Sequence, residues 1–286
     1  MKRISKFINK NKFKISTVIF LCVGFILSSL NFNYKNFTLK RDDFFSEGST
    51  SCGGPVVDET IDVDDVKLML KNSYEGPLKD EKIVFLTFDD GPSVNTDKII
   101  NILNEKGVKA TFFVVGERLC LGENKDRLLR LYEAGHSIGN HTYSHDFSKI
   151  YKNNKVQVST FLDEVKKTEE VLKELIGERN CENILIRMPG GYGSRKYYND
   201  PNLPELNKKF EEENIRNIDW NSLNGDAEGK PYTKEQMINY VKKTAKGKQY
   251  VVVLMHDREG KEKTVEMLPD IIDYFSSEGY IFKRIN

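Results

Sequence analysis

The sequence predicts an α/β fold, an irregular (β/α) barrel of about seven strands. The first reason is that short apolar segments alternate with helix-like segments from residue 81 onward. The second is the segment Ile83–Phe88, which has almost no polar residue and therefore indicates a strand buried on both faces, as in a parallel sheet covered by helices. The third is the number of strand–helix units, which comes close to the eight of a regular barrel without reaching it.

The elements follow from local composition. Strands are expected where short runs are rich in β-branched and aromatic residues, at 83–88, 110–115, 137–140, 184–186, 215–220, 250–255 and 280–285. Helices are expected where apolar residues recur at helical spacing, at 96–106, 126–134, 160–176, 204–213, 233–245 and 265–278. Several of these helices end at a glycine, which is the usual stop signal.

The N-terminal part has a different composition. Residues 1–14 are basic, and residues 15–32 are uncharged and mostly apolar. An apolar helix of this length spans roughly 27 Å, just enough to cross a hydrocarbon core, so we expect a single-pass anchor with the basic tail in the cytoplasm. A cleaved signal peptide is the alternative, but no Ala-x-Ala site follows, and the apolar run is longer than a usual signal-peptide core.

Between this segment and the barrel lie residues 33–80, which are polar and are expected to act as a tether. One short amphipathic helix is expected within it, near Val63–Asn72. The folded domain is then expected at 81–286, outside the cytoplasm and monomeric. The 44 Lys and Arg residues nearly cancel the 43 Asp and Glu residues, so the net charge gives no reason to expect a nucleic-acid partner.

The four cysteines lack the spacing of a zinc knuckle or a disulfide framework, although Cys120 and Cys181 could pair.

Polar residues stand where the expected strands end, which is where ligands bind in parallel α/β folds. Two adjacent acids close the first strand, and two histidines four residues apart follow the third, a spacing that on a helical turn lets both hold one cation. Each group has a plainer reading by itself, such as a solvated turn or core packing of the single Trp. The five groups are Asp89-Asp90, His141-x-x-x-His145, Arg187-Met-Pro189, Asp219-Trp220 and Leu254-Met-His256.

In this order, the five groups resemble the five motifs of the polysaccharide deacetylases, carbohydrate esterase family four, also called the chitooligosaccharide-deacetylase homology domain. The resemblance covers about residues 82–284, and each motif occurs once. It is greatest to the peptidoglycan N-acetylglucosamine deacetylases. It implies a distorted (β/α) barrel and metal-dependent hydrolysis of acetyl groups on sugars.

Motif matching also implies residue roles. Asp90, His141 and His145 resemble the metal ligands, Asp89 the catalytic base and His256 the catalytic acid. Arg187 resembles the residue that orients the base, and Asp219 the partner of the acid. Trp220 and Leu254 resemble walls of the acetyl pocket, and Gly190 the backbone N–H that stabilises the oxyanion. An Asp-His-His set suits Zn²⁺ best, although Co²⁺, Ni²⁺ or Mn²⁺ would also bind.

One position departs from the family pattern. Many members carry an aromatic residue after the proline of the third motif, whereas this chain has Gly190. The backbone N–H survives this change, but a surface for stacking sugar is lost.

The expected function is metal-dependent hydrolysis of the acetamide of N-acetylglucosamine in a cell-wall glycan, peptidoglycan first. Muramic acid, chitin-like polymers and poly-N-acetylglucosamine are the alternatives within the enzyme class. A catalytically dead glycan-binding module on the same scaffold is the alternative outside it.

Overall fold

The computed structural model describes residues 60–177 and 183–286, which belong to one compact unit. The strands are β1 (Thr60–Ile61), β2 (Ile83–Gly91), β3 (Thr111–Val114), β4 (Ser137–Asn140), β5 (Ile184–Ile186), β6 (Ile215–Asn217), β7 (Ser222–Leu223), β8 (Tyr250–His256) and β9 (Ile281–Ile285). The α-helices are α2 (Val63–Leu70), α3 (Val94–Glu105), α4 (Asn124–Glu133), α5 (Phe147–Ile150), α6 (Val158–Ile176), α7 (Tyr192–Tyr197), α8 (Leu203–Glu212), α9 (Lys234–Ala245) and α10 (Glu262–Ser277). Two 3₁₀ turns, η1 (Gly116–Cys120) and η2 (Lys152–Asn154), complete the described elements.

All seven expected strands are confirmed, with ends shifted by a few residues. Within the described residues, nine strands form one sheet in the order β1-β9-β2-β3-β4-β5-β6, and β8 pairs with β2 and β7. Every recorded strand pair is parallel. The chain itself joins β6 to β7, where the N–H of Ile218 donates to β5 and the N–H of Asn221 donates to β8. This α/β arrangement is consistent with an irregular (β/α) barrel.

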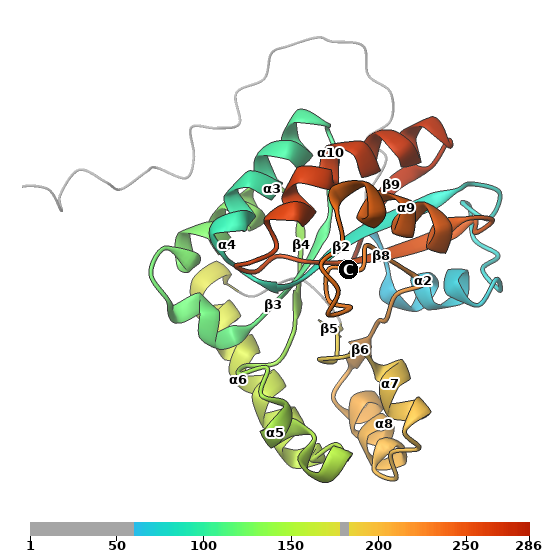
Figure 1. Cartoon of the computed structure of the whole chain (residues 1–286). Helices are drawn as coiled ribbons and strands as arrows, with labels where there is room; N and C mark the ends of the chain where they lie inside the picture. The colour runs from blue at the N-terminus through green and yellow to red at the C-terminus, as the bar shows by residue number, and fades with distance from the viewer. Residues whose placement is uncertain (1–59, 178–182) are drawn as a thin grey trace, which may run out of the picture. The chain divides into compact units, whose positions relative to one another are not determined.

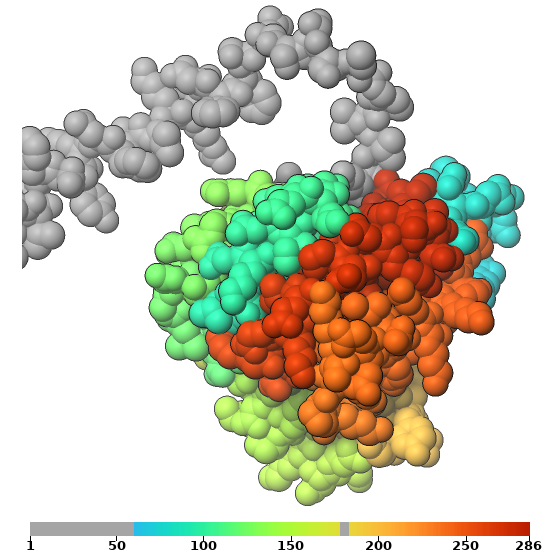
Figure 2. All heavy atoms as spheres, turned by 45° about the horizontal axis from the view of Figure 1, so that its top comes forward, coloured from blue at the N-terminus to red at the C-terminus, as the bar shows by residue number. Residues whose placement is uncertain are grey.

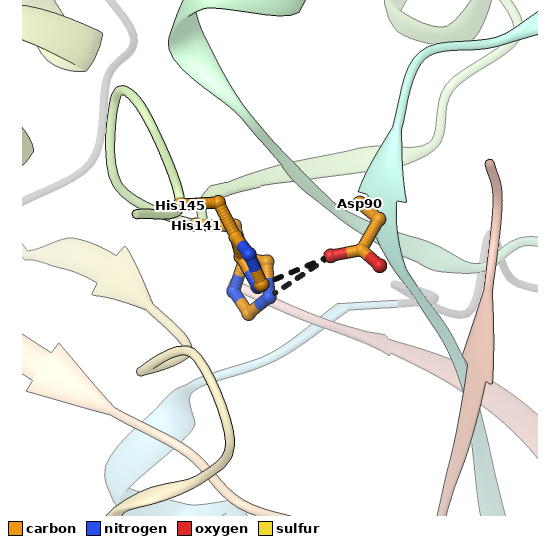
Figure 3. Close-up of side chains that lie close together, drawn as sticks. All are labelled: Asp90, His141 and His145. Carbon is orange, nitrogen blue, oxygen red and sulfur yellow. Dashed lines mark ion pairs between the residues drawn. The ribbon is translucent and has the colours of Figure 1, made fainter. Parts of the chain in front are cut away.

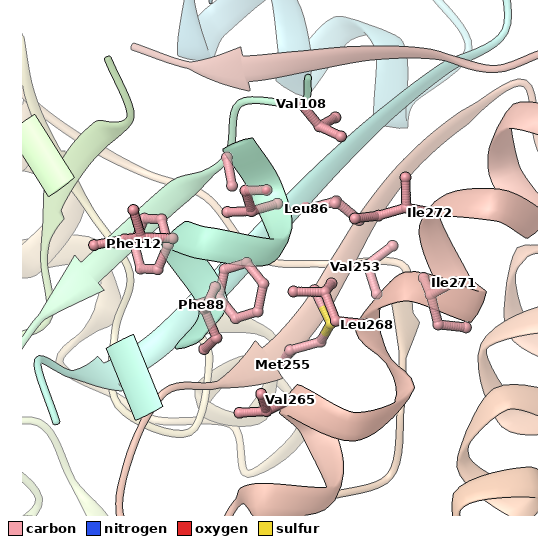
Figure 4. Close-up of a cluster of buried hydrophobic side chains, with 14 of the residues drawn as sticks. Leu86, Phe88, Val108, Phe112, Val253, Met255, Val265, Leu268, Ile271 and Ile272 are labelled. Atoms are coloured by element: carbon pink, nitrogen blue, oxygen red, sulfur yellow. The ribbon is translucent and has the colours of Figure 1, made fainter. Parts of the chain in front are cut away.

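Helices α3, α4, α9 and α10 pack on the outer face of the sheet (Figure 1). The alternate side chains Leu86 and Phe88 of β2 point to this face and meet Val253 and Met255 of β8. Helix α10 covers them with a row of aliphatic side chains at helical spacing (Figure 4). Figure 2 shows α10 in red at the surface, between α3 in green and α9 in orange.

The other side chains of β2 point inward. Ile83 and Phe85 lie in a buried cluster with Phe113 of β3 and with α2. Three residues of α2, Val63, Val66 and Met69, have no exposed surface. Because α2 contributes to this cluster, residues 60–80 are part of the folded unit and not a tether, which corrects that part of the sequence prediction.

The strand β1 supports the same correction, since it pairs in parallel with β9. Among the described residues no helix has the length and apolar character needed to cross a membrane. The predicted anchor at 15–32 lies outside the described residues, as does Cys181.

Candidate active site

The two adjacent carboxylates reach one site because the end of β2 is irregular. Asp89 pairs with Phe113 in the register with β3, and Gly91 pairs with Val114, so Asp90 is the extra residue of a β-bulge. Asp90 has a φ of 73°, in the left-handed region. On a regular strand, neighbouring side chains point to opposite faces. The bulge removes this constraint and brings Asp90 to the histidines that follow β4.

Asp90, His141 and His145 form a compact set of potential metal ligands (Figure 3). Their ligand atoms all lie within 4.8 Å of one another. Asp90 Oδ1 is 3.5 Å from His141 Nε2 and 3.3 Å from His145 Nε2. This oxygen is buried and accepts no hydrogen bond. A buried carboxylate oxygen without a donor costs free energy, and a cation between the three side chains would remove that cost.

The protonation of the three side chains also suits a metal. Burial, together with the nearby charge of His141, lowers the pKa of His145 to about 4, so its ring is neutral at neutral pH. Burial alone would raise the pKa of Asp90, but the combined charges of His141, His145, His256 and Arg258 outweigh it, and the pKa is lowered. His141 donates from Nδ1 to the carbonyl oxygen of Arg187 at 2.7 Å, so that in the neutral ring the lone pair lies on Nε2.

Arg187 holds the other carboxylate. Its side chain is fully buried, and its Nη1 donates to Asp89 Oδ1 at 2.9 Å and to Thr87 at 2.7 Å. The guanidinium also lies over the ring of Phe113, 4.2 Å from its centroid. The carboxylate that Arg187 contacts is therefore that of Asp89. The guanidinium of Arg187 beside Asp89 and the two histidines beside Asp90 explain how two adjacent acids are accommodated.

The sequence prediction for the partner of His256 is wrong. His256 Nδ1 lies 2.7 Å from Asp226 Oδ1, and the His256 backbone N–H donates to Asp226 Oδ2 at 2.9 Å. Burial alone would lower the pKa of His256, but the hydrogen bond and charge of Asp226, with the charges of Asp89 and Asp90, outweigh it and raise the pKa. Asp226 therefore occupies the position that was assigned to Asp219.

Asp219 instead holds the turn after Arg187. Its two carboxylate oxygens accept from the backbone N–H groups of Tyr192 at 2.9 Å and Gly193 at 2.7 Å. These are the first N–H groups of α7, which have no partner within the helix. The side chain of Asp219 thus anchors the segment that contains Gly190 and does not contact His256. A hollow of about 610 Å³ between α2, α7 and α8 borders Asp219. It is not lined by the triad, the three metal-ligand candidates Asp90, His141 and His145.

The three expected substrate-binding residues lie at the same end of the sheet. Leu254 is buried on β8 in register with Thr87 of β2, and His256 is in register with Asp89. Trp220 packs against the interior cluster and lies beside Gly191. If Gly191 carried a Cβ, that atom would come within 2.8 Å of the indole. Gly190 has a φ of 73°. Contact of these residues with substrate stays a prediction.

Sequence reasoning missed Asp226 because it follows β7, a strand of only two residues that has no recognisable pattern. The available signal was an acid in an Asn-Gly-Asp turn between β7 and α9. It also passed over Asp257, which directly follows the catalytic-acid candidate. Burial raises the pKa of Asp257 to about 8, and its side chain accepts from Ser93 and Thr96 at the start of α3.

Comparison with known proteins agrees with this geometry. Residues 77–207 match the polysaccharide deacetylase family. The chain is 30% identical over 210 residues to a peptidoglycan-N-acetylglucosamine deacetylase of Bacillus cereus, a match that covers 72% of this chain and 70% of that protein. The chain belongs to the polysaccharide deacetylase family. It is therefore a hydrolase that acts on the amide of an acetylated glycan.

Two further relatives bear on this deacetylase. A solved carbohydrate esterase family four structure from Streptococcus mutans has 34% sequence identity and a TM-score of 0.70, and the match covers 79% of this chain and 92% of that one. A peptidoglycan-N-acetylmuramic acid deacetylase of Bacillus subtilis is 28% identical over 214 residues, which is 74% of this chain and 73% of that protein. The Streptococcus mutans structure shows the shared fold, and the two Bacillus relatives are named for different sugars, N-acetylglucosamine and N-acetylmuramic acid.

Proposed function

We propose that this deacetylase removes the acetyl group from N-acetylglucosamine residues of peptidoglycan, in a reaction that depends on a divalent metal, with Zn²⁺ as the preferred ion. The observation that carries the metal dependence is the buried Asp90 oxygen that faces two histidine nitrogens without a hydrogen-bond donor. The similarity to a peptidoglycan-N-acetylglucosamine deacetylase supports this choice of sugar.

The residues divide the work of amide hydrolysis. An ion held by Asp90, His141 and His145 would supply positive charge for the water and the acetyl oxygen. Asp89 takes a proton from the attacking water, whose oxygen bonds to the acetyl carbon. Arg187 holds Oδ1 of Asp89, and Oδ2 lies 3.8 Å from His141 Nε2, on the side of the triad.

The leaving nitrogen needs a proton as its bond to the acetyl carbon breaks. His256 supplies it, because its pKa is raised and it remains protonated at higher pH than an ordinary histidine. Asp226 orients the ring through Nδ1, so that Nε2 carries the transferable proton. The backbone N–H of Gly190 is proposed to stabilise the oxyanion of the tetrahedral intermediate. The products are acetate and a free amine on the sugar.

The proposed location is the outer face of the cell membrane. The basic residues 1–14 before the apolar residues 15–32 favour an anchor with the enzyme outside, where peptidoglycan lies.

Mass spectrometry of muropeptides tests the proposed substrate. Peptidoglycan is digested after incubation with the full chain purified with Zn²⁺, and fragments are sequenced to locate each lost acetyl group. Loss from glucosamine supports the proposal, and loss from muramic acid alone overturns the choice of sugar. Absence of acetate release from peptidoglycan, with release from chitin oligomers, overturns the choice of polymer.

A further inference from the structure

Phe147 is an exposed aromatic side chain beside the metal-ligand candidates. It is the first residue of α5, two positions after His145, and 45% of its surface is exposed. Its ring centroid is 5.4 Å from that of His145, in an edge-to-face arrangement. Of the exposed aromatic residues in the described ranges, Phe147 is the one with a recorded ring contact to the triad.

The ring of Phe147 also lies beside Gly190. A Cβ added to Gly190 would come within 3.3 Å of two atoms of the Phe147 ring, closer than most real contacts of a Cβ. Gly190 is the position where the third motif of many family members has an aromatic residue. In this chain an aromatic ring from a different element, α5, occupies the space next to that position.

Phe147 is held in place before any ligand binds. The side chain of Asp146 accepts from the backbone N–H of Ser148 at 2.9 Å and caps the short helix. Tyr151 contacts the Phe147 ring at a centroid distance of 5.4 Å, and its hydroxyl donates to the carbonyl oxygen of Pro189 at 3.0 Å. The helix α5 is thereby tied to the turn that contains Gly190. A ring fixed in this way loses little entropy when a ligand packs on it.

The chemistry of the surface indicates what would bind there. An exposed aromatic face is apolar and electron-rich, so it favours flat groups with apolar, weakly positive C–H edges. One face of a pyranose ring presents such C–H groups. The acetyl group must lie at the triad. The ring of Phe147 contacts His145 and is exposed to solvent, so it would meet the adjoining sugar.

We propose that Phe147 is a stacking surface for the pyranose ring next to the sugar that loses its acetyl group, in place of the aromatic residue missing at position 190. The proposal rests on the proposed function, because it takes the substrate to be a linked glycan. It makes Phe147 a determinant of chain-length preference and not of the chemical step.

The test compares substrate length. Acetate release is measured with the full chain, loaded with Zn²⁺, on β-1,4-linked N-acetylglucosamine oligomers of increasing length. We expect Phe147→Ala to raise KM for the long oligomers by about 3- to 10-fold, with little change in kcat and a smaller effect on the shortest substrate. Phe147→Trp should restore the low KM, and Phe147→Leu, which keeps the bulk without the flat ring, should not.

Tyr132→Ala is the matched control, since Tyr132 is also 45% exposed but lies on α4 and has no recorded contact with the site. It should keep the length dependence of the unmodified chain. Metal content and thermal melting of each variant show whether it folds. If Phe147→Ala does not fold, Phe147→Leu provides a second measurement.

An equal loss of kcat/KM at every length would mean that Phe147 only supports His145, and would overturn the proposal, as would no loss at any length. Calorimetry of the longest oligomer measures binding without turnover, so it tests the stacking role even if the proposed function fails. If the unmodified chain releases no acetate, weaker binding by Phe147→Ala and recovery in Phe147→Trp still support the stacking role. Equal binding by all variants overturns it.

Discussion

At the scale of residues, the site depends on a separation of roles between two neighbouring carboxylates. Asp89 is paired with the buried guanidinium of Arg187, whereas Asp90 faces two histidines and keeps an oxygen without a donor. The bulge at Asp90 makes this possible, because two residues in succession on a regular strand would diverge.

The two carboxylates should respond differently to the same substitution. Asp90→Asn should bind Zn²⁺ much more weakly, because it removes a charged ligand. Asp89→Asn should retain most of the metal but lose turnover by roughly 10²- to 10⁴-fold, because it removes the base. Bound metal is measured after dialysis against a weak chelator, and acetate release is measured on chitooligosaccharide.

Excess Zn²⁺ serves as the control in this experiment, since it should partly restore Asp90→Asn and leave Asp89→Asn inactive. Equal loss of metal in both variants would contradict the assignment.

A second residue-scale prediction concerns pH. His256 acts as an acid only while protonated, so activity should fall as pH rises through its pKa, which Asp226 helps to raise. Asp226→Asn removes the charge that favours the protonated ring, so the alkaline limb of the kcat profile should move to lower pH. The measurement is kcat against pH for the Zn²⁺-loaded chain.

Asp219→Asn is the comparison for the pH experiment, because Asp219 follows β6, accepts hydrogen bonds from the start of α7 and has no recorded contact with His256. Its alkaline limb should stay where it is in the unmodified chain, even if its rate is lower. A shift in Asp219→Asn but not in Asp226→Asn would restore the sequence assignment.

At the scale of elements, α2 connects the stability of the barrel to a segment that looked like a linker. Its three buried apolar residues belong to the same cluster as the inward-facing side chains of β2, β3 and β5. Short strands enclose a narrow interior, and its apolar side chains must be covered for the barrel to be stable. Helix α2 provides part of this cover.

Substitutions in α2 test this role. Met69→Ala should lower the free energy of unfolding by about 2–5 kcal/mol, because it leaves a cavity in a fully buried cluster. Leu68→Ala, in the same helix but 41% exposed, should cost much less. Denaturant unfolding of the purified full chain measures both, and similar small losses would return residues 60–80 to the status of a tether.

At the scale of the whole molecule, the proposed function depends on where the N-terminal segment places the enzyme. Basic residues before an apolar run favour retention of that end in the cytoplasm. We therefore expect protease added to intact protoplasts to digest the deacetylase and leave a short membrane-bound fragment. Resistance to protease until the cells are lysed would contradict an outward-facing enzyme, and a soluble extracellular product would indicate cleavage of the segment.

The sequence was sufficient for the alternation of strands and helices, for all seven longer strands and for the metal-ligand candidates. These features depend on local information: apolar periodicity sets the elements, and each strand end places its following residues at one edge of a parallel sheet. The resemblance to the polysaccharide deacetylases rested on the same strand ends, and the comparisons confirmed it.

Three features required the tertiary structure. Asp226 lies beside His256, where Asp219 was expected, because β7 pairs with β8 and carries the following turn to the end of that strand. A strand of two residues has no pattern from which this pairing could be predicted. The inclusion of α2 depended on an uncovered interior that exists only once the strands have assembled. Phe147 stands near Gly190 because α5 and the turn after β5 pack together although they are distant in sequence. Such contacts are set by how the elements pack against one another, and residue order along the chain does not contain that information in a locally readable form.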